Sequence, residues 1–240
     1  MSEGLRKIRL WDLPIRLVHW SFVVLIPLMW WTAEDHNISL HVKLGYGVLA
    51  LVLFRILWGF FGSSNARFSQ FVKGPGAVMG YLRKTFSGGE AEVHAGHNPA
   101  GGWSVVILLL LLATQVGLGL FALDEDNVGG PLTYLVSYET SRTLAERHEL
   151  VFNLIVLFVV FHIAAVAYYA VVKKDRLVPP MITGSRDLPE AVEAPRLAPL
   201  WKALVILALS AAFSWWIAKG APTSKQQLEA PPPPSMEDYM

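Results

Sequence analysis

The stretch ERHELVFNLIVLFVVFHIA, residues 146–164, decides the fold. An almost unbroken apolar run separates His148 from His162, fourteen residues further along the chain. Ionisable side chains are costly inside a membrane and by default mark a functional site there. In a helix, a fourteen-residue spacing places the two imidazoles roughly 21 Å apart in depth, with an angular offset of only ~40°. Both imidazoles are therefore expected to face one bundle interior.

The composition of the whole chain is that of a membrane protein. Of its 240 residues, 53% are hydrophobic and 16% are charged, and the mean hydropathy is +0.42, which is too apolar for an ordinary soluble domain. A net charge of +1, without basic stretches interleaved with aromatics, argues against nucleic-acid binding. Because the chain contains no cysteine, disulfides, thiolate metal sites and covalently attached haem are excluded.

Five stretches approach the ~20 apolar residues that a membrane-crossing helix needs. They are Pro14–Trp31, Leu40–Phe61, Trp103–Leu123, Leu150–Val172 and Leu200–Ala218. The sequence thus predicts an all-α fold, a transmembrane four-helix bundle with an appended fifth transmembrane helix. The predicted divisions are a four-helix domain over 1–175, a cytoplasmic linker over 176–198, the fifth helix over 199–219 and a disordered Pro-rich tail over 220–240.

The loop charges predict the orientation. Lys and Arg concentrate before the first span, between the second and third spans, and after the fourth, whereas the other two loops of the bundle are mostly acidic. Loops rich in Lys and Arg stay on the cytoplasmic side. We therefore expect a cytoplasmic N-terminus and, with five spans, an external C-terminus.

Depth sorts four histidines into two pairs. His41 and His148 lie at the outer ends of the second and fourth spans, whereas His19 and His162 lie toward the cytoplasm. Each imidazole on the fourth span thus has a partner from another helix at its own depth. Two such pairs are the arrangement that two bis-histidine haems require, each iron taking two axial imidazoles.

Single histidines also allow simpler roles. A histidine at a helix end can lie at the membrane interface, bonded to backbone or water, and this applies to His41 and His148 taken alone. Zinc is the competing metal, but two imidazoles leave a zinc site two ligands short.

His36, in a short outer loop, is expected to be solvated, and His97 with Asn98 is expected to help cap the helix opened by Pro99. His94 and His97 form an H-x-x-H pair, which can bind a metal ion on a loop, but the sequence shows no third ligand for such a site.

Two arginines are candidates to bind haem propionates. Arg55 interrupts the second span fourteen residues after His41, so it lies at the level of His19 and His162. A buried guanidinium needs an anion, and a propionate is a suitable bidentate partner. Arg16, about one turn before His19, could serve the same haem, or could extend to the cytoplasmic interface. Gly45, Gly47, Gly117 and Gly119 could let a macrocycle approach the backbone, although small residues are common in any membrane bundle.

Four segments together resemble the bacterial cytochrome b561 family and the related b-type cytochrome subunits of nickel–iron hydrogenases and formate dehydrogenases. They are WDLPIRLVHW, HVKLGYGVLALVLFRILWGFFG, GHNPAGGWSVVILLLLL and ERHELVFNLIVLFVVFHIA. The resemblance covers about residues 8–175. It implies two non-covalent b haems, ligated by His19, His41, His148 and His162, in a protein of the bacterial inner membrane that exchanges electrons with the quinone pool.

The leading hypothesis is electron transfer between quinone and a redox partner on the outer face, such as a c-type cytochrome. The acidic third loop could guide a basic partner by complementary charge. One alternative is superoxide:quinone oxidoreductase activity, although the outer loops offer few cations to attract superoxide. Another is a haem-b anchor subunit of a hydrogenase or dehydrogenase complex. A solute transporter is disfavoured by the lack of inverted repeats or broken helices.

Overall fold

The computed structural model describes residues 4–87, 95–124 and 128–220. Within these residues, five helices are long and apolar enough to cross a membrane. They are α1 (Leu13–Glu34), α2 (Ile38–Phe61), α5 (Pro99–Gly119), α6 (Tyr138–Val171) and α8 (Leu200–Ala218). The prediction of an all-α transmembrane protein is confirmed. The predicted tail lies outside the described residues apart from Gly220, and His94 also lies outside them.

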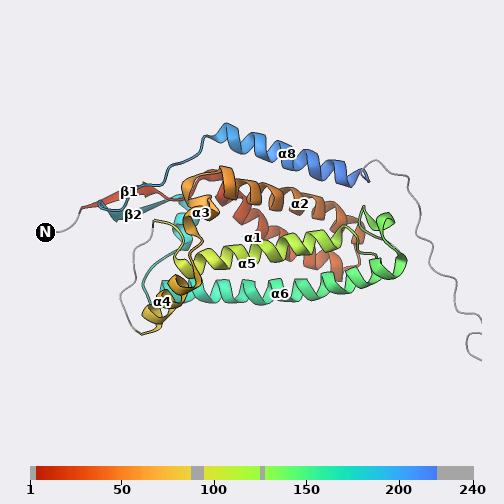
Figure 1. The fold of residues 1–240 in the computed structure, drawn as a ribbon, viewed down its shortest axis with the longest axis horizontal. Coiled ribbons are helices and arrows are strands. Elements are labelled where there is room, and N and C mark those ends of the chain that lie inside the picture. Colours follow the sequence, from red (N-terminus) through yellow and green to blue (C-terminus); the bar gives the residue numbers. More distant parts are fainter. Residues whose placement is uncertain (1–3, 88–94, 125–127, 221–240) are drawn as a thin grey trace, which may run out of the picture.

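The first four long helices form the bundle, and the fifth lies outside it. Helix α1 packs against α2, α2 contacts α5, and α5 runs beside α6, while α8 packs along α2 (Figure 1). The largest correction to the predicted spans is in α6, which begins at Tyr138 rather than Leu150 because Ser137 caps its first turn. His148 therefore lies well inside a helix instead of before its start.

A small antiparallel sheet marks one end of the bundle, called here the sheet end; the opposite end is called the far end (Figure 1). Strand β1 (Leu5–Arg9) pairs with β2 (Ser185–Pro189), which follows the short helix α7 (Val178–Thr183). The sequence predicted no strand and only a linker in this region. Each strand buries one apolar side chain, Ile8 or Leu188, and such short segments pair only because the bundle brings them together.

Short elements fill the remaining connections. Between α2 and α5 lie η1 (Ser64–Ala66), α3 (Phe68–Phe71) and α4 (Pro75–Phe86), and η2 (Thr133–Leu135) precedes α6. Helix α4 buries none of its residues and lies at the sheet end (Figure 1). The sequence did not predict these elements; η1, α3 and η2 span only three or four residues, too few to show a hydrophobic period.

Asp12 fixes the start of α1 against α2. One carboxylate oxygen accepts a hydrogen bond from the backbone N–H of Ile15 at 2.8 Å, and the other accepts from Nε1 of Trp58 at 3.0 Å. Trp58 is fully buried, and Asp12 is only 7% exposed. The N-terminal cap of α1 is therefore also a contact between helices, and it sets the position of the turn that carries Arg16 and His19.

Removal of this carboxylate should destabilise the fold. We expect Asp12→Ala to lower the free energy of unfolding by about 1–2 kcal/mol, the usual cost of a lost cap, with a further loss from the unpaired Trp58 N–H. Asp12→Asn should retain most of the stability because its amide oxygen still accepts. Asn37→Ala, at the exposed cap of α2, is the matched control and should cost less. Thermal unfolding in detergent measures the stability of the three variants. Equal losses of stability in Asp12→Ala and Asn37→Ala would contradict this account.

Candidate functional site

The four expected histidines come together in the two expected pairs. The ring centroids of His41 on α2 and His148 on α6 are 6.1 Å apart. Those of His19 on α1 and His162 on α6 are 6.5 Å apart. The first pair lies toward the far end and the second toward the sheet end. Helix α6 contributes one histidine to each pair.

The spacing within each pair suits a metal ion held between two imidazoles. With a metal–nitrogen distance of about 2.0 Å, two imidazoles on opposite sides of one ion have ring centroids about 6 Å apart. Among the described residues, no group of three or more His, Asp or Glu side chains could hold a metal ion. Each pair therefore fits a metal whose remaining ligands come from a cofactor, as the porphyrin of haem provides.

Backbone carbonyls orient both rings of the far-end pair. Nδ1 of His41 lies 2.9 Å from the carbonyl oxygen of Met29, and Nδ1 of His148 lies 2.9 Å from that of Gln115. A carbonyl oxygen only accepts, so both Nδ1 atoms carry the proton and each Nε2 has its lone pair available. Such a bond from the second ring nitrogen is the usual support of a metal-ligating histidine.

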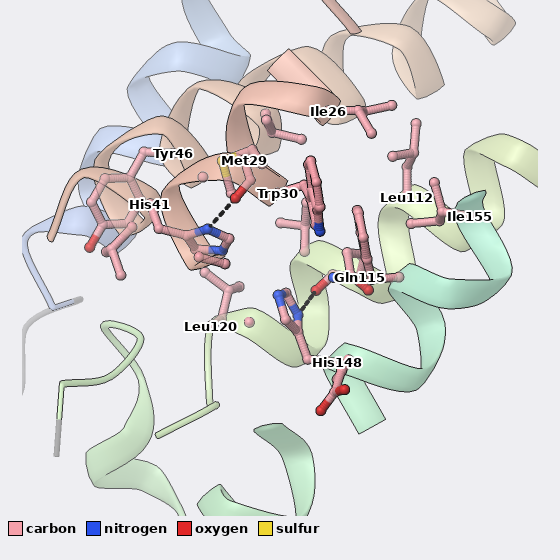
Figure 2. Close-up of a pocket in the computed structure, with 18 of the residues that line it drawn as sticks. Ile26, Met29, Trp30, His41, Tyr46, Leu112, Gln115, Leu120, His148 and Ile155 are labelled. Atoms are coloured by element: carbon pink, nitrogen blue, oxygen red, sulfur yellow. Dashed lines mark hydrogen bonds between the residues drawn. The ribbon is translucent and has the colours of Figure 1, made fainter. Parts of the chain in front are cut away.

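A cavity lies between these two rings (Figure 2). It contains about 1090 Å³ of space free of protein atoms, part of which opens to the exterior, and residues from α1, α2, α5 and α6 line it. The walls are mostly apolar, as a macrocycle requires. Gly45 lines the cavity, as the sequence suggested. The exposed carboxylates of Glu34 and Glu149 also line it.

Gly119 makes room for the imidazole of His148. A Cβ atom at this position would lie 2.9 Å from Cε1 and 3.2 Å from Nδ1 of His148. Both distances are shorter than an ordinary van der Waals contact, so a side chain here would push the ring out of place. At Gly117, about half a turn earlier, a Cβ would meet no atom within 4 Å. Of these two glycines on α5, only Gly119 is required by the site.

The sheet-end pair is held differently. Phe161 and Ile163, on either side of His162, are 58% and 60% exposed, whereas His162 turns toward His19. Nδ1 of His19 is buried without a hydrogen-bond partner, so no carbonyl fixes the tautomer of this ring. The imidazole of His19 also packs edge-on against Trp20, with centroids 5.2 Å apart.

At the sheet end, Arg55 is buried against protein groups that the sequence did not suggest. Arg55 is 8% exposed, donates to the carbonyl of Ala66 at 3.4 Å, and lies over the ring of Phe68 at 5.4 Å. Its charge interacts electrostatically with the carboxylate of Asp12. Asp12 was overlooked because its role depends on the packing of α1 against α2.

Arg16 reaches the segment after α6 rather than bulk solvent. Its Nη1 donates to the carbonyl of Ile182 in α7, while its Nε is buried without a partner. The side chain therefore retains a donor that no described protein group uses. A role in binding a propionate stays a prediction for both arginines.

His97 was expected to help cap a helix or, as the alternative, to form a metal-binding pair with His94, which lies outside the described residues. Asn98 alone caps α5, accepting from the N–H of Gly101 at 2.7 Å. The His97 ring instead packs between Trp11 and Phe71, with centroid distances of 4.8 and 4.7 Å. Burial lowers the pKa of His97 to about 3, with smaller contributions from the charges of Arg55 and His162, so its imidazole is neutral at physiological pH.

Comparison with known families decides the identity of the bundle. Residues 10–184 match the model of the prokaryotic cytochrome b561 family. The chain belongs to this family. Haem b binding and electron transfer in a multi-pass bacterial membrane protein follow from this membership. No curated protein and no solved structure matches the chain. The matched region ends before α8, so the match does not include the fifth helix.

The contact at Gly119 gives a direct test of the far-end site. We expect Gly119→Ala to weaken haem binding there about tenfold or more, the effect typical of disturbing the support of a metal ligand, because the added methyl group displaces His148. Haem content per chain, measured on the purified protein, should fall. Gly117→Ala is the matched control and should retain wild-type haem content. Equal haem content in both variants would contradict this role for Gly119.

Proposed function

We propose that this b561-family chain binds two b haems, one in each histidine pair, and transfers electrons between the quinone pool and a redox partner on the outer face. The observation that carries the proposal is the presence of two facing histidine pairs that share α6. Haem supplies one-electron redox chemistry when bound. His19, His41, His148 and His162 would hold the haem irons, and the protein would supply a largely apolar environment.

Charge supports an orientation with the sheet end in the cytoplasm. Of the described residues, Arg6, Lys7 and Arg9 in β1 and Lys173 and Lys174 after α6 lie at the sheet end. Among the described residues the far end is mostly acidic, with Glu34, Asp35, Asp124, Glu139, Glu146 and Glu149 against Lys43, Arg142, Arg147 and Lys219. Positively charged loops remain inside. The His41–His148 pair is then the outer site and the His19–His162 pair the inner one.

The acidic far end favours a basic redox partner, such as a c-type cytochrome. Glu34 and Glu149 line the outer cavity itself and are exposed, so a partner with complementary charge would dock close to the outer haem. The same carboxylates would repel an anion, which argues against superoxide as the substrate of this site. If the chain instead anchors a hydrogenase or dehydrogenase, such a subunit should copurify with it.

A reduced-minus-oxidised spectrum of the purified protein tests the central proposal. The wild-type protein should show b-type bands equivalent to two haems per chain. His162→Ala should remove the inner haem and spare the outer one, whereas His41→Ala should do the reverse, because each pair shares no ligand with the other. Haem quantification gives the stoichiometry. A wild-type protein without haem, or one mutation that removes both haems from a folded chain, would overturn the proposal.

Electrostatic docking predicts a salt-dependent rate. Electron transfer between this protein and a basic c-type cytochrome should slow as ionic strength rises, because salt screens exposed charges beyond about 10 Å at 0.1 M. Replacement of Glu34 and Glu149 together by Gln should slow the reaction at low salt and flatten its salt dependence. Glu193→Gln, beyond β2 at the sheet end, is the control and should leave the rate unchanged. Stopped-flow spectroscopy measures these rates, and a rate independent of salt would contradict the docking surface.

A further inference from the structure

The sheet end contains buried side-chain nitrogens that lack hydrogen-bond partners. Among the described residues, four side-chain nitrogens are buried without a partner: Arg16 Nε, His19 Nδ1, Arg67 Nε and His97 Nδ1. All four belong to residues in the half of the bundle that holds the His19–His162 pair. Buried polar groups are normally satisfied, and each exception requires an explanation. A shared explanation is that an acceptor-rich group binds here.

The His97 side chain cannot move to find a hydrogen-bond partner for its Nδ1. The backbone on its N-terminal side is held by Asn65, whose Nδ2 donates to the carbonyls of Leu10 and Ala95. On its C-terminal side, Asn98 is fixed as the cap of α5. The ring itself is wedged between Trp11 and Phe71. The unpaired Nδ1 is therefore a property of the fold and not of a loose side chain.

Of the carboxylates that the structure describes at the sheet end, the two that are not exposed, Asp12 and Asp175, face other groups, although Oδ1 of Asp175 makes an ion pair and no hydrogen bond. The two oxygens of Asp12 accept from Ile15 and Trp58, and Asp175 pairs with Arg186 at 2.7 Å. In the part of the chain that the structure describes, neither carboxylate accepts a hydrogen bond from any of the four nitrogens.

Electrostatic contacts place the missing acceptor beside the inner pair. The charges of Arg55 and His162 contribute to the lowered pKa of His97, so the three residues belong to the same region of the sheet end. Arg16 is about one turn from His19. An acceptor that serves these nitrogens would be surrounded by positive charge, which favours an anion.

We propose that His97 donates a hydrogen bond to a propionate carboxylate of the haem held by His19 and His162, within a donor pocket that Arg16 and Arg55 complete. Haem b carries two propionates, whose oxygens can accept from Nε of Arg16 and, in the Nδ1–H tautomer, from His97. His97 is a binding residue for the cofactor in this scheme and not an axial ligand. The inference rests on the proposed function, because it requires a haem between the inner histidines.

The test compares His97→Leu with His97→Asn in the full chain. Leu fills the space between Trp11 and Phe71 but donates nothing, whereas the amide N–H of Asn can take the place of Nδ1–H. The negative charge of a propionate disfavours reduction of its haem, and a hydrogen-bond donor partly offsets that charge. His97→Leu should therefore lower the reduction equilibrium constant of the inner haem about tenfold, or ~59 mV for one electron, and His97→Asn should lower it much less.

Spectroelectrochemical titration measures both haems in one sample, and the outer haem is the internal reference. The spectrum of His162→Ala, which should retain only the outer haem, shows which signal belongs to which haem. Resonance Raman spectroscopy should show the propionate bending band shifted in His97→Leu and restored in His97→Asn. If the wild-type protein holds two haems and neither the potential nor this band changes in His97→Leu, the inference is wrong while the proposed function stands. If the wild-type protein lacks the inner haem, the proposed function itself fails.

Discussion

The bundle depends on the presence of two imidazoles on one face of α6. An ionisable ring inside a membrane is costly unless it binds something, and the fourteen-residue spacing sets both rings toward the same interior. His148 then requires a partner near the far end and His162 a partner nearer the sheet end. The packing of α1 and α2 supplies them as His41 and His19, with centroid distances of 6.1 and 6.5 Å.

The two pairs have different surroundings, and the differences are chemical. Carbonyls of Met29 and Gln115 fix the far-end rings, and carboxylates line the cavity between them. The sheet-end pair instead lies in the half of the bundle that contains arginines and unpaired nitrogens. Since nearby charge and hydrogen bonds set the potential of a haem, these differences would give the two proposed haems different potentials.

The elements outside the four-helix bundle stabilise the sheet end. Residues of β1, β2 and α8 contribute Ile8, Leu188 and Ala203 to the same core as Trp58. Asp12 joins that core to the first turn of α1. The position of His19 therefore depends on contacts between segments that are far apart in the chain, such as β1 and β2. Neither this sheet nor the double role of Asp12 follows from a local pattern.

The sequence by itself determined the membrane class, the five long helices, the family and the pairing of the four histidines. Helical rise and periodicity are local properties, and the cost of an imidazole in lipid holds whatever the fold. Only the tertiary structure decided that Gly119, and not Gly117, must lack a side chain, that the charge of Asp12 acts on Arg55, and that His97 is wedged between two aromatic rings. These features depend on distances of a few ångströms between separate helices, which hydropathy and spacing along one chain do not specify.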